Sequence, residues 1–129
     1  MSVSILVVDD EPDVALLFRQ RFRREIREGT YVMHFATSGE MALEQLRNGI
    51  KPTLIVILSD INMPGMDGLQ LLGEIKQHLP DLPVMMVTAY GDNERRQRAS
   101  ELGACEFLTK PVDFDYLKAQ LRQLGNGAD

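Results

Sequence analysis

The sequence predicts an α/β domain with one five-stranded parallel sheet, doubly wound by helices on both faces. Apolar runs that do not alternate with polar residues are typical of strands covered on both sides. Four such runs occur: Ile5–Val8, Leu54–Leu58, Val84–Val87 and Phe107–Leu108. Segments of helical period separate them, and a fifth, more mixed run adds one strand, so the order is βα repeated five times. This alternation favours parallel strands joined by right-handed crossovers.

The first helix is expected between the run ending at Val8 and the mixed segment Tyr31–Ala36, which is predicted to be an edge strand. Pro12 near its start and Gly29 at its end mark its limits. Its apolar residues follow three- and four-residue spacing: Val14, Leu17, Phe18, Phe22 and Ile26. Five arginines occupy its other faces: Arg19, Arg21, Arg23, Arg24 and Arg27. The arginines favour a solvated face, and partner docking is the alternative.

The next two helices have clear limits in the sequence. Residues 39–48 form one of them, with Ser38 as N-cap and Gly49 as the residue that ends it. The other ends before Pro80 and keeps its apolar residues on one face: Leu69, Leu72, Ile75 and Leu79. Both helices therefore have a side that can pack on the sheet.

The last two helices differ in how they can be anchored. Residues 92–102 form a polar helix stopped by Gly103, and between Asp92 and Glu101 only Ala99 is apolar. The final helix begins near Asp113 with an apolar face: Phe114, Leu117, Leu121 and Leu124. Residues 1–124 are thus predicted to form the domain, and residues 125–129 a flexible tail or linker stub.

Composition limits the kind of protein. The 129 residues, 44% hydrophobic and 26% charged, fit one globular domain rather than a disordered chain or a repeat array. A net charge of −5 argues against direct nucleic-acid binding. The single cysteine, Cys105, excludes an intramolecular disulfide and is expected to be a small buried residue. The N-terminus has neither a signal peptide nor a membrane span, so the expectation is a soluble cytoplasmic protein without membrane contact.

Polar side chains gather where the predicted strands end. Asp9 and Asp10 follow the first strand, Asp60 the third, Thr88 the fourth, and Thr109 and Lys110 the fifth. In an open parallel sheet these positions share one edge, where such folds bind ligands. Three neighbouring carboxylates repel one another unless a cation lies among them, and oxygen ligands suit Mg²⁺. Lys110 and the hydroxyl of Thr88 suit the oxygens of a phosphoryl group, so the sequence predicts a phosphoryl site over a magnesium ion.

Four motifs carry a family resemblance that covers residues 3 to 124. They are V-D-D-E at Val8–Glu11, S-D-I-N-M-P-G-M-D-G at Ser59–Gly68, T-A at Thr88–Ala89 and K-P at Lys110–Pro111. In this order and spacing they resemble the response regulator receiver domain of two-component signalling. The resemblance implies a flavodoxin-like fold with strand order 2-1-3-4-5. It also implies that Asp60 accepts a phosphoryl group from a histidine kinase or phosphotransfer protein.

The resemblance further implies a role for each site residue. Asp10, Asp60 and the backbone carbonyl of Asn62 would bind Mg²⁺, with Asp9 acting through a water. Thr88 and Lys110 would hold phosphoryl oxygens. The Lys110–Pro111 bond would be cis.

Three more positions follow from the resemblance. Small Ala89 would leave room for the phosphoryl group, and Thr88 and Phe107 would form the conformational switch. Phe107 has no hydroxyl to satisfy and is expected to turn inward even without phosphate. Tyr90, at the rim, would either shield the acyl phosphate from water or only pack on the following helix.

Less specific interpretations stay open. Asp9 and Asp10 could cap the following helix, Asp60 could be a loop acid, and Thr88 a plain strand residue. Asp67 is a rival to Asp60 but is expected to cap the next helix. Lys110 could be an ordinary exposed lysine.

Two other functions are weighed against the receiver. A magnesium-dependent phosphatase or phosphotransferase would need a further acid–base group and a substrate cap, and a pure binding module would not need the intact acid cluster. The expectation is a protein that catalyses only its own phosphorylation and dephosphorylation. Its output is an unknown protein or a C-terminal effector domain, and a homodimer is possible.

Overall fold

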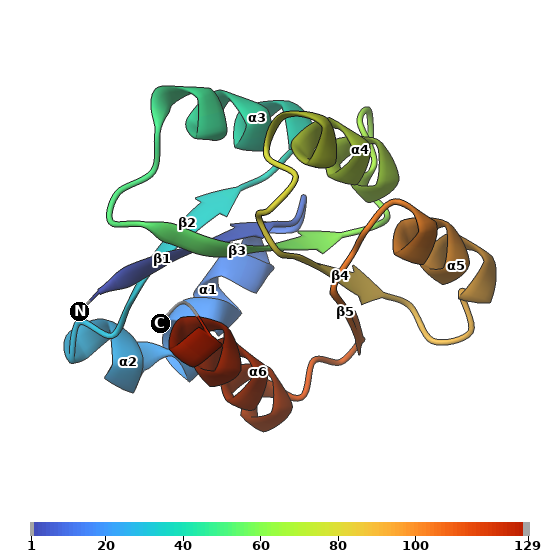
Figure 1. Ribbon diagram of the computed structural model, residues 1–129. Coiled ribbons are helices and arrows are strands. Elements are labelled where there is room, and N and C mark those ends of the chain that lie inside the picture. The colour runs from blue at the N-terminus through green and yellow to red at the C-terminus, as the bar shows by residue number, and fades with distance from the viewer. Residues whose placement is uncertain (1, 128–129) are drawn as a thin grey trace.

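The computed structural model describes residues 2–127, which form one parallel sheet with helices on both faces (Figure 1). The sheet has the strand order β2-β1-β3-β4-β5, and all neighbouring strands are parallel. The strands are β1 (Val3–Val8), β2 (Tyr31–Ala36), β3 (Leu54–Asp60), β4 (Val84–Thr88) and β5 (Glu106–Thr109). The predicted fold class and strand order are confirmed.

Six helices cover the two faces of the sheet. They are α1 (Pro12–Arg21), α2 (Arg23–Arg27), α3 (Gly39–Asn48), α4 (Gly68–His78), α5 (Asn93–Glu101) and α6 (Phe114–Gly127). In Figure 1, α3, α4 and α5 lie on one side of the sheet, and α1, α2 and α6 lie on the other. None of the helices in the described part is long and apolar enough to cross a membrane.

The strands send alternate side chains into two hydrophobic clusters. On β1, Leu6 and Val8 belong to the cluster beneath α3, α4 and α5, whereas Ile5 and Val7 belong to the opposite one. The second cluster is rich in aromatic rings, because Phe18 and Phe22 of α1 and its C-cap pack against Phe114 of α6. Central strands are therefore buried on both faces, which explains their continuous apolar runs.

The first predicted helix is divided in two, contrary to expectation. Phe22, with φ −103° and ψ 16°, leaves the helical conformation between α1 and α2. Its side chain is fully buried and its ring stacks on Phe18 at 6.0 Å between centroids. The ammonium of Lys118 donates a 2.8 Å hydrogen bond to the carbonyl of Arg21 at the break. Aromatic packing and this lysine stabilise a break that helical periodicity does not reveal.

Smaller expectations have mixed outcomes. Ser38 caps α3 by accepting from Met41 N at 3.0 Å, and Gly49 follows with φ 88°, as predicted. Helix α6 continues to Gly127, whereas a flexible tail was expected from residue 125, and residues 128–129 lie outside the described part. Cys105 is exposed rather than buried, because it lies in the irregular connection before β5 and not in the strand.

Candidate functional site

Parallel strands carry the predicted site residues to one edge of the sheet. Asp60 is the last residue of β3 and Thr88 the last of β4, while Asp9 and Asp10 directly follow β1. Lys110 directly follows β5, and its backbone N–H donates to the carbonyl of Thr88 at 2.9 Å. The sheet thus brings together residues that are about a hundred positions apart in the sequence.

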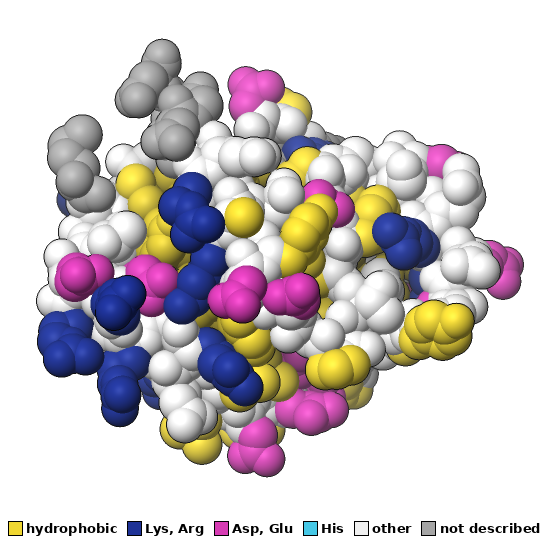
Figure 2. All heavy atoms as spheres, turned by 90° about the horizontal axis from the view of Figure 1, so that it is seen from below, with side chains coloured by type: hydrophobic (Ala, Val, Ile, Leu, Met, Phe, Trp, Pro, Cys, Tyr) yellow, Lys and Arg dark blue, Asp and Glu magenta, His cyan; other side chains and the backbone are white. Residues whose placement is uncertain are grey.

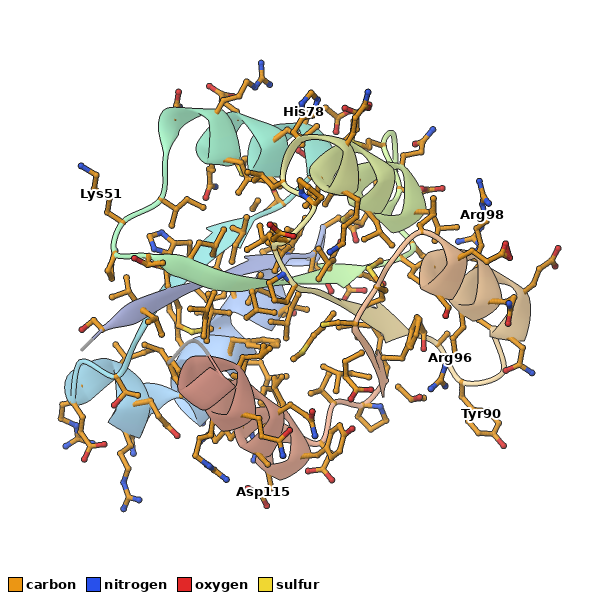
Figure 3. All side chains as sticks on the ribbon, in the orientation of Figure 1. Lys51, His78, Tyr90, Arg96, Arg98 and Asp115 are labelled. Atoms are coloured by element: carbon orange, nitrogen blue, oxygen red, sulfur yellow. The ribbon has the colours of Figure 1, made fainter. Side chains whose placement is uncertain are left out.

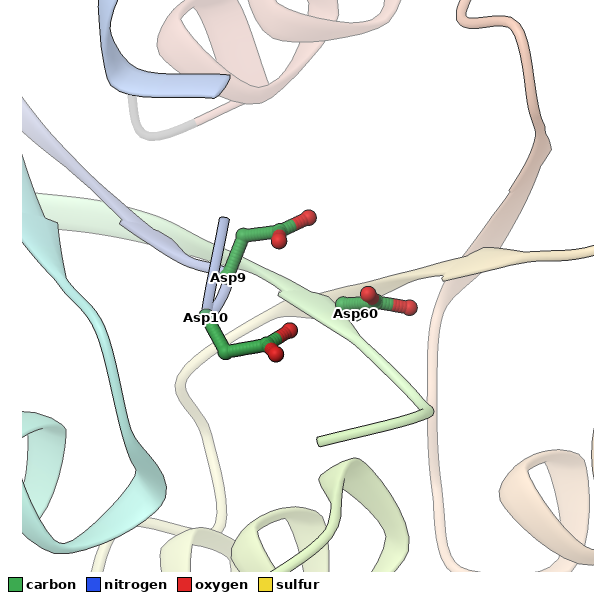
Figure 4. Close-up of side chains that lie close together, drawn as sticks. All are labelled: Asp9, Asp10 and Asp60. Carbon is green, nitrogen blue, oxygen red and sulfur yellow. The ribbon is translucent and has the colours of Figure 1, made fainter. Parts of the chain in front are cut away.

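Three carboxylates face one another at this edge. One oxygen from each of Asp9, Asp10 and Asp60 lies within 4.8 Å of the others, and Figure 4 shows the three side chains directed to the same side. Asp60 and Asp9 are buried, with 5% and 8% of their surface exposed, and Asp10 is half-buried. Like charges held this close in a partly dry environment require a cation to balance them.

Lys110 supplies part of that balance. Its Nζ lies 2.9 Å from Oδ2 of Asp60 and 3.9 Å from Oδ2 of Asp9. Burial by itself would lower the pKa of Lys110, but the hydrogen bond and the charge of Asp60, helped by Asp9, raise it above its usual value. Lys110 is therefore paired with the acid cluster although 40% of its side chain is exposed, and it is not the unpaired surface lysine of the alternative interpretation.

Within the acid cluster, Asp9 is the carboxyl whose pKa is raised. Burial raises the pKa of its carboxyl, and repulsion from Asp60 and Asp10 adds to that rise. The Glu11 N–H, which donates to Oδ1 of Asp9 at 3.0 Å, and the charge of Lys110 act in the opposite direction. Glu11, and neither Asp9 nor Asp10, is the N-cap residue of α1, and its side chain makes no capping bond. The capping alternative for the two aspartates is wrong.

The loop after β3 separates Asp60 from its rival Asp67. Oδ1 of Asp60 accepts from the Asn62 N–H at 3.3 Å, so its carboxylate stays at the site. The side chain of Asp67 instead accepts from Gln70 N at 2.9 Å, within a capping box at the start of α4. Asp67 is a helix cap, as expected, and Asp60 is the acid that joins the cluster.

Gly68 allows this loop to close, a role that the motif contains but sequence reasoning did not assign. A Cβ at position 68 would overlap the backbone oxygen of Asp60 and lie 2.7 Å from the Cα of Ile61. The Gly68 N–H also donates to the Ile61 carbonyl at 2.8 Å. The first turn of α4 can therefore approach the end of β3 only because this residue has no side chain.

The donor set fits a hard divalent cation. Three carboxylate oxygens can lie around one point, and neither cysteine nor histidine belongs to the described cluster. Mg²⁺ binds through one or two carboxylates and keeps water ligands, whereas zinc sites favour nitrogen and sulfur. The residues present therefore suit Mg²⁺.

The predicted switch and rim residues lie around the cluster. Thr88 is buried and Ala89 is exposed. Phe107 is half-buried and packs against the hydrophobic cluster beneath α3, α4 and α5, and its inward turn stays a prediction. The guanidinium carbon of Arg96, on α5, lies 4.9 Å from the centre of its ring.

Tyr90 points away from the site. Its side chain is 92% exposed and extends into solvent from the loop before α5 (Figure 3). The expectation that it packs on this helix is wrong, because an aromatic ring at such exposure has no helix surface against it. A shielding role stays a prediction and requires the loop to move.

A cleft of about 530 Å³ opens beside the acid cluster, between α1 and the start of α6. Its walls are mainly apolar and include Val14, Leu17 and Phe114, and Asp9, Asp60 and Lys110 also line it. A reacting group on another molecule can therefore reach Asp60 from this side. Sequence reasoning did not predict the cleft, because it depends on how two helices distant in sequence lie relative to each other.

Known proteins resemble this chain in sequence. Residues 5–122 match the family model of the response regulator receiver domain. The transcriptional regulatory protein ZraR of Escherichia coli (strain K12) is 37% identical over 122 residues, which are 95% of this chain and 26% of ZraR. The chain therefore spans about a quarter of the length of this curated relative.

Solved structures agree with the fold. A response regulator receiver domain protein from Clostridium thermocellum has a TM-score of 0.85 and 26% identity, over 98% of this chain and 96% of that one. The response regulator TrrA from Thermotoga maritima, in complex with Mg²⁺-BeF, has a TM-score of 0.77 and 34% identity. That match covers 95% of this chain and 98% of TrrA.

Proposed function

Because this chain belongs to the response regulator receiver domain family, we propose that it accepts a phosphoryl group on Asp60. The donor is the phosphohistidine of a histidine kinase or of a phosphotransfer protein. The observation that carries the proposal is the position of Asp60, buried among two further aspartates with Lys110 at 2.9 Å. The proposal includes a cytoplasmic location, which the lack of a cysteine pair favours.

The reaction is an in-line transfer. A carboxylate oxygen of Asp60 forms a bond to phosphorus while the bond between phosphorus and the donor's imidazole nitrogen breaks. The electron pair of the breaking bond stays on that nitrogen. Oδ1 is the freer nucleophile, since it accepts only the 3.3 Å bond from Asn62, whereas Oδ2 is held by Lys110. Lys110 stays close enough to stabilise charge on the phosphoryl oxygens.

Asp10, Asp60 and the backbone carbonyl of Asn62 would hold Mg²⁺, with Asp9 acting through a water. When bound, the ion neutralises the acid cluster and the charge of the incoming phosphoryl group. The hydroxyl of Thr88 and the small side chain of Ala89 would complete the pocket for the phosphoryl oxygens.

The protein turns over only its own aspartyl phosphate. A phosphatase acting on external substrates needs a second acid–base group near the nucleophile. Two residues after Asp60, where such an acid would be expected, the chain has Asn62. The β3–α4 connection is also short, and it leaves no room for an inserted substrate cap.

Phosphorylation changes the surface that an output partner reads. Contacts of Thr88 and the β4–α5 loop with the phosphoryl group favour a conformer in which Phe107 turns further inward. The equilibrium between the two conformers can shift only by the difference in free energy of those contacts in the two states. The output is a partner protein or a C-terminal effector domain. ZraR, of which the chain spans 26%, is named a transcriptional regulatory protein.

Acetyl phosphate labelling of the parent and Asp60→Asn tests the proposal. The parent should gain the mass of one phosphoryl group in Mg²⁺ and lose that gain when EDTA replaces Mg²⁺. Asp60→Asn should gain nothing, while Asp67→Asn, a matched change in the same loop, should be labelled like the parent. Labelling of the Asp60→Asn variant would show that another residue is the acceptor.

A further inference from the structure

The outer face of the first helical segment carries an isolated row of arginines. Arg19 lies near the end of α1, and Arg23 and Arg27 lie on α2, each four residues after the last, which is the spacing of neighbours on a helix face. The spacing persists across the break, because Phe22 N–H donates to the Phe18 carbonyl and Ile26 N–H to the Phe22 carbonyl, each at 2.9 Å. All three arginines are exposed. We call this set the arginine row.

Nothing in the described part of the chain neutralises the arginine row. No described carboxylate lies within 4.0 Å of its three guanidinium groups. The one acid among residues 19–27, Glu25, is already paired with Lys118 at 3.0 Å on the side facing α6. Figure 2 shows dark blue side chains gathered at the left of this view, where α2 lies.

The row does not serve the packing of the domain. Like charges four residues apart on a helix repel and weaken it. Of the three arginines, only Arg19 contacts an aromatic ring in the described part of the chain, its guanidinium carbon lying 4.7 Å from the centre of the Phe35 ring on β2. That contact holds Arg19 on the β2 side of α1, away from the cleft beside Asp60. Arg23 and Arg27 thus have no aromatic or acidic partner within the described fold, and the three charges lie apart from the acid cluster.

Exposed apolar residues border the row. Leu16, one turn before Arg19, is 63% exposed, and Ile26, next to Arg27, is 38% exposed. Arginine combined with apolar contact area is typical of protein–protein interfaces. The rest of the chain is strongly acidic, since five of its 14 basic residues but one of its 19 acidic residues fall within residues 19–27. An extended polyanion such as DNA, or an anionic bilayer, would meet that acidic surface on either side of the row.

We propose that the arginine row docks an acidic helix of a protein partner. Aspartates or glutamates four residues apart on that helix match the spacing of the three guanidinium groups, which form bidentate bonds with carboxylates. An apolar residue of the partner covers Leu16. The surface is separate from the acceptor site, so docking does not depend on Asp60.

Fluorescence anisotropy with a synthetic helical peptide tests the proposal. The probe is an alanine-based peptide with three glutamates at four-residue spacing and one leucine a turn before the first. Its isomer has the same composition with the glutamates spread around the helix. The parent chain should bind the probe, and Arg19→Gln/Arg23→Gln/Arg27→Gln should bind it about tenfold more weakly.

The control variant removes the same charge elsewhere. Arg47→Gln/Arg95→Gln/Arg98→Gln replaces three exposed arginines on α3 and α5, and it should keep the affinity of the parent within about twofold. Equal losses in both variants, or equal binding of the isomer, would reduce the row to a nonspecific charge effect and overturn the proposal. Phosphatidylserine vesicles or a DNA duplex that bind more tightly than the probe, and lose binding only in the first variant, would replace the protein partner with a lipid or nucleic acid.

Discussion

Helices α4 and α5 lie on the same face of the sheet, yet they are anchored very differently. Helix α4 buries four residues, among them Leu72, and begins with the capping box of Asp67 and Gln70. Helix α5 buries Ala99 alone, and the side chain of its N-cap residue Asp92 makes no capping bond. Helix α4 is therefore fixed by core packing and by its cap, while α5 has a single buried residue and no side-chain cap.

The difference corresponds to the two loops that flank the site. The loop before α4 carries Asn62 and follows Asp60, so the proposed acceptor lies between β3 and the well-anchored helix. The loop before α5 carries Ala89 and Tyr90, so the residues proposed to respond to phosphate precede the weakly anchored one. Elements with few buried contacts open most easily, which suits a region that has to change conformation.

Truncating the α4 anchor gives the largest expected effect. Leu72 is fully buried, and Leu72→Ala should lower the free energy of unfolding by about 2–5 kcal/mol through lost contacts and a cavity. Gln97→Ala on exposed α5 should change it by about 0.5 kcal/mol or less. Urea unfolding of both variants measures this. A loss of comparable size in Gln97→Ala would mean that α5 is anchored as firmly as α4.

Removing the N-cap side chains of α4 and α5 should give a smaller difference in the free energy of unfolding than truncating Leu72. Asp67→Ala removes the bond that the Gln70 N–H donates to the Asp67 side chain, while the Asp67 backbone N–H can still donate to Oε1 of Gln70, and it should cost about 1 kcal/mol. Asp92→Ala removes no capping bond, so its unfolding free energy should stay within about 0.5 kcal/mol of the parent. Thermal melts in EDTA compare the pair without a contribution from metal binding. If Asp92→Ala proves the more costly change, α5 has a cap that the structure does not contain.

The better-anchored parts of the molecule are also those that the sequence predicted well. Asp60, Thr88 and Lys110 are each tied to the end of an apolar run, so locating the strands also located the site. Short buried strands are recognisable because burial on both faces leaves a continuous apolar pattern. The caps Ser38 and Asp67 were predictable for a related reason, since their bonds are local in sequence.

Features that depend on distant packing could not be predicted from local patterns. The break at Phe22 depends on the Phe114 ring and on Lys118, nearly a hundred residues later in the chain. The need for Gly68 depends on how closely α4 approaches the end of β3. The outward position of Tyr90 depends on the path of a loop, which neither periodicity nor resemblance determines.

The charge of Asp9 lowers the stability of the folded protein, and the variant Asp9→Asn should reveal by how much. The pKa of Asp9 is raised in the folded state, so the folded protein binds a proton more readily than the unfolded chain. Its charged form therefore opposes folding above the raised pKa, and this penalty disappears as the pH falls through it. In EDTA, Asp9→Asn should be more stable than the parent at neutral pH, by about 1 kcal/mol or less.

A series of urea unfolding curves from neutral to acidic pH measures that difference. The advantage of Asp9→Asn should shrink as the pH falls. Asp13→Asn is the control, because Asp13 is exposed in the first turn of α1, where a negative charge is favourable. Asp13→Asn should leave the stability unchanged or slightly lower. An Asp9→Asn variant that is less stable than the parent at neutral pH would contradict the repulsion argument.

A kinetic effect is expected for Tyr90 on the weakly anchored side. Hydrolysis of the acyl phosphate requires a water in line with the bond between Asp60 and phosphorus. If the β4–α5 loop closes when Asp60 is phosphorylated, the Tyr90 ring covers that approach and offers no strong base to orient the water. Tyr90→Glu would add such a base, and dephosphorylation should become faster by up to about tenfold.

Tyr90→Phe keeps the ring and should lose its phosphoryl group at the rate of the parent. Timed loss of label in the same buffer and Mg²⁺ compares the three proteins. Equal rates in all three would mean that the ring stays in solvent, where the structure places it, and that the weak anchoring of α5 serves the output surface alone.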